Sequence, residues 1–517
     1  MRRNGASRAS LVVLATLAGM VGWDAAAPAQ ERLWKQVGAR NQFPSFGTRV
    51  RSGGDIDGDG IWDVLVGDSD YPDAQGNPIG AAWIFSGVDG SLVYRLSPKS
   101  GVNESFGSGV AIGPDVDGDG HAEFFVTAPN ATPAGAAYLY SGSDASVKWS
   151  LSGSTGNNIG GISATVSDHD GDGLADFAMG CRTTTGFVKI LSSASGSEIT
   201  TISDPSTSPG YFGSAIENAG DVNADGVDDL IVGDESDSTL NLRAGAAFVF
   251  SGTDGSTLYE IYEQEQDAAF GRAVAGLGDL DGDGCSEFIV AAPRASSVNG
   301  KAVVHSGKDG SVIRTYTGAS SRFVGRSVAS AGDMNGDGIP EYCVGGADTV
   351  AEGVWLLSGR DGRLLYHFLG SGGFFSDGFG ALCASLGDVD GDGRPDMVIG
   401  APFADYNAIG FQGAIYAISG NDWFLDVSDR FPIAGEIVTF TMAQTNATSP
   451  AAMFLVDVNG APTPALLAVG NCDTTGRYVL FGAVPSGLTG VYVGLLSIGV
   501  DPGGRFVDSD IEQLFFQ

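Results

Sequence analysis

The sequence contains few of the side chains that most often carry out catalysis. Its 517 residues include four histidines and five cysteines, and only 27 lysines and arginines accompany 62 acidic residues. The histidines, at positions 121, 169, 305 and 367, are far apart in the chain, which argues against a shared catalytic site. The odd, scattered set of cysteines is not a disulfide framework, so we expect most of them to be small buried side chains.

Positive charge is equally scarce, and the net charge is −35. Nucleic acids and anionic lipids are bound through clusters of lysine and arginine that meet phosphate groups. The sequence has no basic stripe of this kind, so neither is expected as a partner. No helical period of useful length is present, which favours an all-β chain.

The N-terminus has the pattern of an export signal. Arg2, Arg3 and Arg8 precede an apolar run over residues 11–23, and Ala27-Pro28-Ala29 has the small residues of a cleavage site. The run is too short to span a bilayer comfortably, and no second candidate follows it. We therefore predict a signal peptide over residues 1–29 and a secreted, extracellular or cell-surface protein without membrane insertion after cleavage.

One short acidic loop occurs seven times in the sequence, whereas other functional motifs are few. The copies begin at residues 55, 115, 168, 221, 279, 333 and 388, and the first reads DIDGDGIWD. Each has an oxygen-bearing side chain at loop positions 1, 3, 5 and 9 and glycine at position 6. A single copy would be explained equally well as a solvated acidic turn. A merely soluble turn does not need the invariant glycine and the acid at position 9 in seven copies.

This spacing predicts calcium sites. Ca²⁺ takes six to eight oxygen ligands, and alternate residues of a tight turn point inward together around the ion. Position 7 is expected to contribute its backbone carbonyl, so its side chain is free to vary, and His121 and Cys285 are bystanders. Up to seven structural calcium ions are predicted. The predicted ligands are Asp55, Asp57, Asp59, Ile61, Asp63, Asp115, Asp117, Asp119, His121, Glu123, Asp168, Asp170, Asp172, Leu174, Asp176, Asp221, Asn223, Asp225, Val227, Asp229, Asp279, Asp281, Asp283, Cys285, Glu287, Asp333, Asn335, Asp337, Ile339, Glu341, Asp388, Asp390, Asp392, Arg394 and Asp396.

Two loops differ in charge from the other five. Loops 4 and 6 have Asn223 and Asn335 at position 3, where the others have aspartate. Because fewer ligand charges usually weaken calcium binding, we expect these two sites to fill last.

The spacing of 53 to 60 residues between loops indicates the architecture. Each period contains four short alternating or apolar runs bounded by Gly, Pro and Asp, which predicts four antiparallel strands. Seven such repeats predict a seven-bladed β-propeller over residues 30–422. The last repeat lacks its fourth strand, and the segment 31–38 resembles the missing one, so we expect it to complete blade seven. Alternating segments over residues 423–517 predict a small C-terminal β-sandwich.

The repeat resembles the FG-GAP repeat of the integrin α-subunit propeller and its bacterial secreted relatives. The Phe-Gly pair stands at residues 46–47, 106–107, 212–213, 270–271 and 379–380, and Gly400-Ala401-Pro402 is the Gly-Ala-Pro element. Two repeats depart, with Ile159-Gly160 and Val324-Gly325 in place of the pair. The resemblance implies that each acidic loop joins strands 1 and 2 of a blade and holds calcium at one rim of the propeller.

The resemblance also favours a non-enzymatic recognition or cell-adhesion module for an extracellular protein or glycan. On that model the loops between strands 2 and 3 and between blades form the binding face. They carry Tyr71, Arg182, Tyr211, Arg243, Arg294, Arg322, Phe374, Phe375, Phe403, Tyr406 and Phe411. A carbohydrate-binding lectin and a calcium-dependent polysaccharide lyase are the alternatives. No catalytic residue is predicted.

Overall fold

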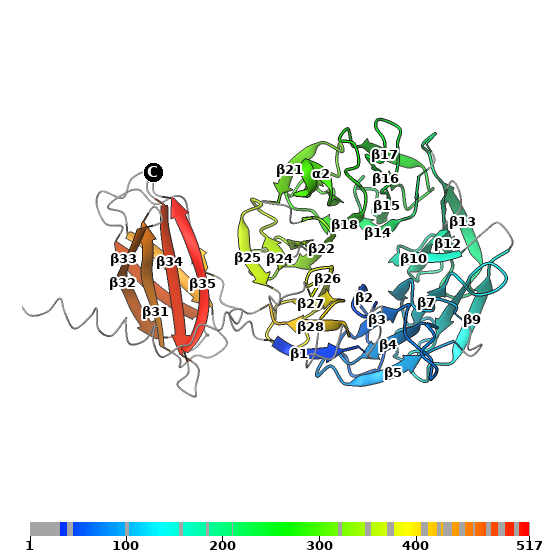
Figure 1. The fold of residues 1–517 in the computed structure, drawn as a ribbon, viewed down its shortest axis with the longest axis horizontal. Helices are drawn as coiled ribbons and strands as arrows, with labels where there is room; N and C mark the ends of the chain where they lie inside the picture. Colours follow the sequence, from blue (N-terminus) through cyan, green and yellow to red (C-terminus); the bar gives the residue numbers. More distant parts are fainter. Residues whose placement is uncertain are drawn as a thin grey trace, which may run out of the picture.

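A ring of antiparallel sheets dominates the structure, a computed structural model. It describes residues 32–38, 45–98, 103–154, 159–181, 186–208, 210–318, 323–346, 353–369, 377–404 and 412–420, and the backbone of seven strands further on. Seven four-stranded sheets surround a common axis, each with its first strand innermost (Figure 1). The predicted seven-bladed propeller is confirmed.

The blades follow one another in chain order. Blade 1 consists of β2 (Arg49–Arg51), β3 (Val64–Asp68), β4 (Ala81–Phe85) and β5 (Leu92–Leu96), and blade 2 of β6 (Val110–Ile112), β7 (Phe124–Ala128), β8 (Ala136–Tyr140) and β9 (Val147–Ser152). Blade 3 consists of β10 (Ile159–Val166), β11 (Asp176–Cys181), β12 (Phe187–Leu191) and β13 (Glu198–Ser203), and blade 4 of β14 (Ala215–Gly220), β15 (Asp229–Asp234), β16 (Ala246–Phe250) and β17 (Thr257–Tyr262). Blade 5 consists of β18 (Ala273–Gly278), β19 (Glu287–Ala292), β20 (Lys301–His305) and β21 (Val312–Thr317), and blade 6 of β22 (Ser327–Gly332), β23 (Glu341–Gly346), β24 (Gly353–Leu357) and β25 (Leu364–Leu369). Blade 7 consists of β26 (Leu382–Gly387), β27 (Asp396–Ala401), β28 (Ala414–Ile418) and β1 (Arg32–Val37).

The second strand of each blade forms the core. All residues of β3, β7, β11, β15, β19, β23 and β27 are buried, because a neighbouring blade covers each face. The fourth strands lie at the circumference and alternate between exposed and half-buried residues, as in β5. The continuous apolar runs and the alternating runs of the sequence therefore correspond to different strands of the same blade.

The Phe-Gly pair packs adjacent blades together. The five phenylalanines are at most 4% exposed, and Ile159 and Val324 take the same buried place in the two repeats that lack phenylalanine. Gly107 has φ of 87°, and a Cβ there would lie 2.3 Å from the carbonyl oxygen of Ala81 in blade 1. Only glycine permits both the backbone conformation and this close approach.

The ring is closed by strands from opposite ends of the repeat array. β1 pairs in antiparallel fashion with β28, with Val37 opposite Ala414. The Trp34 indole N–H donates to the Gly87 carbonyl at 2.7 Å, which ties the closing strand to blade 1. The predicted completion of blade seven by the N-terminal segment is confirmed.

Removal of residues 32–37 is expected to abolish the cooperative unfolding transition or to cause aggregation. The deletion leaves the edge of β28 unpaired, and exposed strand edges associate with other chains. Size-exclusion chromatography and thermal melting measure the effect, and a chain that begins at residue 30 is the control. A stable, cooperatively melting monomer after the deletion contradicts the strand exchange.

An ion pair crosses the centre of the ring. Arg51 on β2 of blade 1 lies 2.5 Å from the Glu217 carboxylate on β14 of blade 4. The other five blades have alanine at the corresponding place of the first strand, namely Ala111, Ala164, Ala275, Ala329 and Ala384. Burial raises the pKa of Glu217 and Arg51 opposes that rise, while water still reaches 31% of the Glu217 side chain. The pair links two blades on opposite sides of the axis.

A double-mutant cycle with Arg51→Ala and Glu217→Ala tests this link. We expect a coupling free energy of about 1 kcal/mol, at the upper end for a solvent-accessible pair, because the channel walls restrict both side chains. Chemical denaturation measures the four unfolding free energies. Additive effects of the two substitutions would show that the pair contributes nothing across the axis.

The C-terminal strands form two separate antiparallel sheets. One contains β29 (Leu425–Val427), β30 (Ile437–Ala443) and β33 (Arg477–Ala483), and the other contains β31 (Pro450–Val458), β32 (Ala461–Asn471), β34 (Tyr492–Val500) and β35 (Phe506–Phe515). This agrees with the predicted small β-sandwich. The described part of the chain has one short helix, α2 (Ala295–Val298), and no described helix has the length and apolar character needed to cross a membrane.

Candidate metal centre: seven acidic loops

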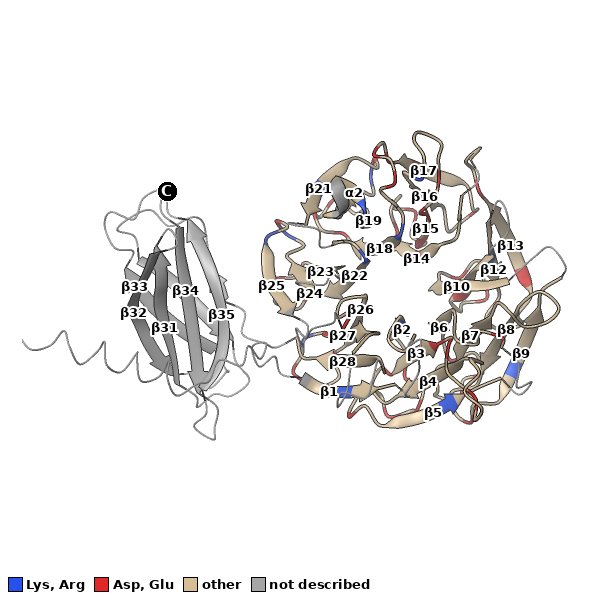
Figure 2. Ribbon diagram, viewed as in Figure 1, with Lys and Arg blue, Asp and Glu red and all other residues tan. Residues whose placement is uncertain are grey.

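Each acidic loop joins the first and second strands of its blade, and its carboxylates organise its backbone. In loop 1 the Asp55 carboxylate accepts hydrogen bonds from the N–H groups of Gly58, Asp59 and Gly60, at 2.7, 3.1 and 2.7 Å. The Asp59 carboxylate accepts from Ile61 N–H at 2.9 Å. These bonds wrap the chain around the side chains at positions 1, 3 and 5. Acidic residues recur around the whole ring (Figure 2).

The loop requires two left-handed residues. The glycine at position 6 has φ between 85° and 92° in all seven copies. Position 4 also has positive φ, and there loop 4 has Ala224 at 59° where the other loops have glycine. This conformation is costly for alanine because its Cβ crowds the following carbonyl.

The acid at position 9 is buried and connects two parts of the blade. Asp63 is fully buried, and its carboxylate accepts from Ile56 N–H at 2.7 Å and from Gly87 N–H at 3.0 Å. Gly87 belongs to the turn between strands 3 and 4, so this one side chain joins both turns at that rim. The same pair of bonds forms at Asp176, Asp229, Glu287 and Asp396.

Burial makes these carboxylates costly to ionise without a cation. It raises the pKa of Asp63, Glu341 and Asp396 to about 7 and that of Glu287 to about 6. Backbone hydrogen bonds oppose the rise, but they do not outweigh desolvation. A bound cation would lower these pKa values, because it favours the charged form of each carboxylate.

The carboxylates converge in five of the seven loops. Their ligand oxygens lie within 4.8 Å of one another in loops 1, 2, 3, 5 and 7, with four residues contributing in loop 2 and three in each of the others. Within the described residues, loops 4 and 6 form no such group of acids, because position 3 is Asn223 or Asn335. In loop 6 the Asn335 amide donates to Glu341 at 2.7 Å. An all-oxygen donor set of this kind fits a hard divalent cation.

Two of the side chains at position 7 form hydrogen bonds to the preceding loop. The His121 ring donates from Nδ1 to the Ile56 carbonyl at 2.9 Å, and the Arg394 guanidinium donates to the Met334 carbonyl at 2.5 Å. Both acceptors are at position 2 of the loop in the neighbouring blade. These residues therefore link consecutive loops, a role that the sequence did not suggest.

The turn between strands 3 and 4 supplies a further contact that sequence reasoning missed. Its third residue approaches the carboxylate at position 5 in four blades. The pairs are Ser143 with Asp119 at 2.8 Å, Thr253 with Asp225 at 3.0 Å, Lys308 with Asp283 at 3.4 Å and Arg360 with Asp337 at 3.2 Å. Alignment of the first six repeats in the sequence reveals this position, because the turn between strands 3 and 4 has nearly the same length in each of them.

Comparisons with known proteins agree with this geometry. The FG-GAP repeat matches residues 106–140, 270–312 and 384–418, and the FG-GAP-like repeat matches residues 333–399. Integrin alpha-V of Gallus gallus is 29% identical over 236 residues, which are 42% of this chain and 21% of that protein. Integrin alpha-5 of Xenopus laevis is 30% identical over 213 residues, 37% of this chain and 20% of that protein. Integrin alpha-4 of Xenopus laevis is 30% identical over 148 residues, 26% of this chain and 14% of that protein.

This chain is an integrin-α-like FG-GAP propeller. It spans about a fifth or less of the length of these three relatives. A solved structure of BBS1N in complex with ARL6DN, soaked with mercury, covers 76% of this chain and 97% of its own, with 9% identity and a TM-score of 0.48.

The histidines of the FG-GAP propeller are dispersed over blades 2, 3, 5 and 6. The rings of His121, His169 and His305 donate from Nδ1 to the backbone carbonyls of Ile56, Ser167 and Gly310, and His367 stacks on Trp355. Among the described residues these rings share no partner. Cys181, Cys285, Cys343 and Cys383 are buried free thiols, as expected, and the Cys472 side chain lies outside the described part.

The buried carboxylates predict how calcium and pH together affect stability. The folded protein keeps protons on Asp63, Glu341 and Asp396 up to about pH 7, whereas an unfolded chain loses them near pH 4. Without calcium, stability is therefore expected to fall as the pH rises from about 4.5 to about 7. Calcium would bind the ionised form, so the rise in melting temperature on adding calcium is expected to grow over the same range.

Thermal melting in EDTA and in millimolar calcium, at pH 5 and at pH 7.5, measures this effect. At the higher pH we expect calcium to raise the melting temperature by more than about 10 °C, since ions that bind only the folded state stabilise it by mass action. Magnesium is the control and should be a poor substitute. An equal calcium effect at the two pH values contradicts the assignment of the buried acids as ligands.

Proposed function

We propose that this protein is an exported calcium-binding propeller that recognises an extracellular protein through the face opposite its acidic loops. The calcium ions are structural, because each would close the turn between strands 1 and 2 of a blade. The support for calcium over smaller ions is the set of flexible carboxylate and carbonyl donors, since Mg²⁺ demands a nearly ideal octahedron. The export signal of residues 1–29 lies outside the described residues, and export remains part of the proposal.

The observation that carries the proposal is a group of exposed hydrophobic side chains on blade 4. Tyr211, Leu240 and Leu242 are 50, 50 and 58% exposed. Tyr211 belongs to the loop that enters the blade, and the two leucines belong to the loop between β15 and β16. We call Tyr211, Leu240, Leu242 and Arg243 the blade 4 surface. Exposed apolar groups with a polar border mark protein interaction sites.

Hydrogen bonds hold the loops of the blade 4 surface together. Ser238 N–H donates to Ser208 Oγ at 2.9 Å, and Asp267 N–H donates to the Leu242 carbonyl at 2.9 Å. Arg243, whose φ is 47°, pairs with Asp267 at 2.7 Å and forms a polar border. Loops from blades 3, 4 and 5 are thus joined into one surface. Organised loops bind with a smaller loss of conformational entropy.

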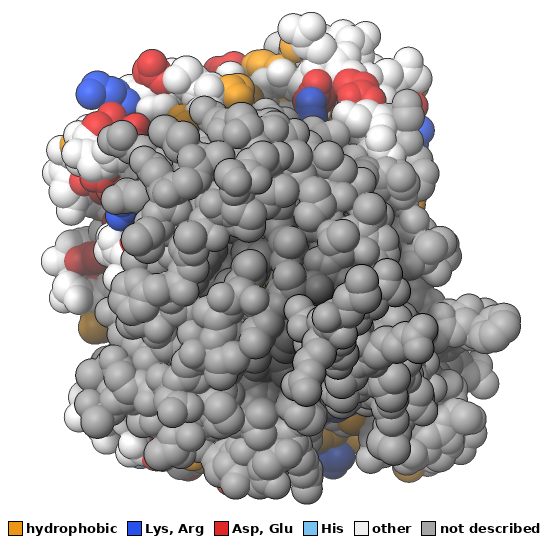
Figure 3. Space-filling model, turned by 90° about the vertical axis from the view of Figure 1, so that its left-hand side faces the viewer, with side chains coloured by type: hydrophobic (Ala, Val, Ile, Leu, Met, Phe, Trp, Pro, Cys, Tyr) orange, Lys and Arg blue, Asp and Glu red, His pale blue; other side chains and the backbone are white. Residues whose placement is uncertain are grey.

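Other residues predicted for this face have different environments. Tyr71 packs edge-on against Trp83, with Arg95 5.5 Å from its ring, so it is partly engaged within its own blade. Arg294 is exposed and Phe403 is half-buried. Arg182, Arg322, Phe374, Phe375, Tyr406 and Phe411 lie outside the described residues. Around the margin of the side view in Figure 3, acidic and basic side chains of the described residues are interspersed among uncharged ones.

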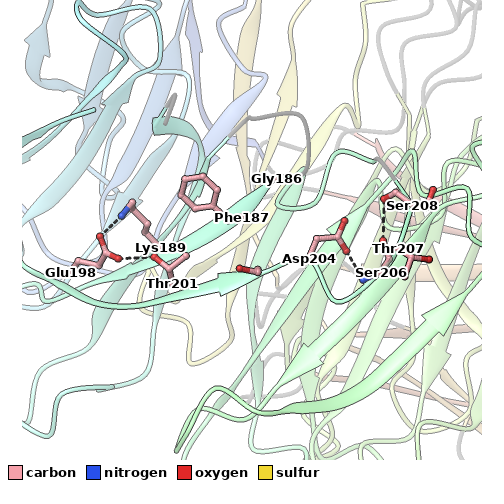
Figure 4. Close-up of a pocket in the computed structure, with 10 residues that line it drawn as sticks. Gly186, Phe187, Lys189, Glu198, Thr201, Asp204, Ser206, Thr207 and Ser208 are labelled. Carbon is pink, nitrogen blue, oxygen red and sulfur yellow. Dashed lines mark hydrogen bonds and ion pairs between the residues drawn. The ribbon is translucent and has the colours of Figure 1, made fainter. Parts of the chain in front are cut away.

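A glycan is the second candidate ligand, because a pocket is lined in part by the loop that leads to Tyr211. It has a volume of about 470 Å³ and lies along β12, β13 and the following loop (Figure 4). Phe187 offers an aromatic face, and the ion pair of Lys189 with Glu198 and the hydroxyl of Thr201 offer polar contacts. An aromatic ring beside polar groups suits a sugar. The pocket also borders Ser208, so both candidates would use adjacent surfaces.

The variant Leu240→Ser with Leu242→Ser tests the proposal. Labelled protein is applied to arrays of purified extracellular proteins and of glycans, with calcium and with EDTA. We expect binding to a protein target that the double variant loses, while its melting temperature changes by no more than about 2 °C because exposed side chains contribute little to stability. The control is Val312→Ser, since Val312 is also 58% exposed but lies at the calcium rim.

Other outcomes would replace this proposal. Binding to glycans alone, lost in Phe187→Ala and kept in the leucine variant, favours the lectin alternative. Cleavage of an acidic polysaccharide that depends on one cluster of Arg or His residues favours the lyase. Protein binding that is equal in the leucine variant and the unmodified chain places the contact elsewhere.

A further inference from the structure

A single lysine distinguishes loop 2 from the other six loops. Lys148 on β9 pairs with the Asp117 carboxylate, and its Nζ lies 2.9 Å from Glu123 Oε1. Its side chain is only 16% exposed, and that of Glu123 is fully buried. Asp117 and Glu123 are two of the four acids whose oxygens converge in this loop. The lysine ammonium thus lies directly on the predicted cation ligands.

The other blades show what normally occupies this place. In each blade the pairing of strands 3 and 4 contains a bulge, and Lys148 is the unpaired residue of that bulge in blade 2, between Val147 opposite Tyr140 and Trp149 opposite Leu139. The corresponding residues are Leu33, Val93, Ile199, Leu258, Ile313 and Leu365, all apolar and packed against the core. A lysine here loses that packing, so its charge is the feature that sets blade 2 apart.

The lysine also changes how the position 9 acid is held. In loops 1, 3, 4, 5 and 7 one oxygen of that acid accepts from the N–H of the second residue after strand 3 of the blade. In loop 2 the corresponding oxygen, Glu123 Oε1, faces Lys148. The other Glu123 oxygen keeps its bond to Val116 N–H, at 2.6 Å.

Two other cations form ion pairs with loop acids, but they do so from a different side. Lys308 and Arg360 pair with the position 5 acids Asp283 and Asp337, and their side chains are 66 and 59% exposed. Water screens these pairs, and the side chains are free to move away. Lys148 instead contacts positions 3 and 9 from a largely buried place. Its ammonium and a calcium ion on the same oxygens would repel each other strongly, because screening is weak there.

We propose that Lys148 is an internal counter-cation that stabilises loop 2 without calcium and must leave Asp117 and Glu123 before calcium binds. This inference rests on the proposed calcium binding. Ligand charge alone ranks loop 2, with four acids, among the strongest sites. When the positive charge of Lys148 is added to the four acids of loop 2, the net charge of that loop is −3. Loops 4 and 6 have the same net charge, because each has one asparagine among its four ligand side chains. Loop 2 therefore fills after loops 1, 3, 5 and 7.

The variant Lys148→Met tests this inference in the full-length protein. Methionine keeps the length of the side chain and restores an apolar residue at the bulge. We expect calcium binding at one site to tighten by about tenfold or more, since one opposing charge is removed from the ligand oxygens. Equilibrium dialysis against radioactive calcium then detects one more bound ion at intermediate free calcium.

Thermal melting supplies a second readout. In EDTA, Lys148→Met should melt below the unmodified protein, because Glu123 loses its counter-charge. In saturating calcium the deficit should disappear or change sign. Lys189→Met is the matched control, since Lys189 is 13% exposed and pairs with Glu198 away from the acidic loops. It should lower the melting temperature equally in both conditions and leave calcium binding unchanged.

A second variant, which introduces a lysine in another blade, keeps the inference testable if Lys148→Met fails to fold. Ile313→Lys places the lysine at the bulge of blade 5, where position 9 is also glutamate, and should weaken one calcium site. Identical isotherms for the unmodified protein and Lys148→Met, or an equal melting deficit with and without calcium, overturn the inference. An unmodified protein that binds no calcium overturns the proposed calcium binding itself, so the two failures are distinguishable.

Discussion

The propeller depends on a buried carboxylate in every blade. The acid at position 9, such as Asp63 or Asp176, receives backbone N–H groups from its own loop and from the turn between strands 3 and 4. It therefore determines how the two turns at one rim lie against each other. Because burial favours its neutral form, the same side chain makes the fold responsive to any cation at the loop. Stability and the proposed ion binding therefore depend on the same carboxylate.

Contacts between blades extend this local order around the ring. In several repeats the side chain of the third residue of the outer strand donates a hydrogen bond to a backbone carbonyl of the next blade. The donors and acceptors are Trp34 and Gly87, Tyr94 and Ser143, Trp149 and Ser193, and Tyr259 and Gly307. His121 and Arg394, at position 7 of their loops, form two further contacts between blades at the same rim. Each blade thus buries its faces and orders its turns against its neighbours, so closure by β1 affects all seven blades.

The seven copies are alike in backbone and different in charge, and the differences are where function is expected. Lys148 replaces an apolar residue beside loop 2, and Arg51 and Glu217 replace alanines at the axis. The exposed leucines of blade 4 lie in a loop between strands, where no packing requirement demands leucine. In a repeat protein, equivalent positions in different copies have the same packing requirements. A residue type that occurs in one copy alone is therefore not explained by packing.

The convergence of the acids in loops 1, 2, 3, 5 and 7 was predictable from the sequence because the order of each loop is local, whereas ion binding stays a prediction. Nine residues contain both the donors and the glycines that turn the chain, so the positive φ at position 6 follows from the pattern. The strand exchange was also predictable, since the missing strand of blade 7 has a counterpart at residues 31–38. The burial of position 9 was not, because the covering turn is about 24 residues away in the chain, as Gly87 is from Asp63.

By itself, then, the sequence determined the repeat, the number of blades, the acidic loops and the closure of the ring, all of which follow from composition and spacing along the chain. Only the tertiary structure decided which charged groups meet. Arg51 and Glu217 are 166 positions apart and pair because blades 1 and 4 face each other across the axis. Lys148 reaches loop 2 because a bulge turns its side chain toward the carboxylates. These contacts between charged groups depend on the positions of the strands in space, which spacing along the chain does not determine.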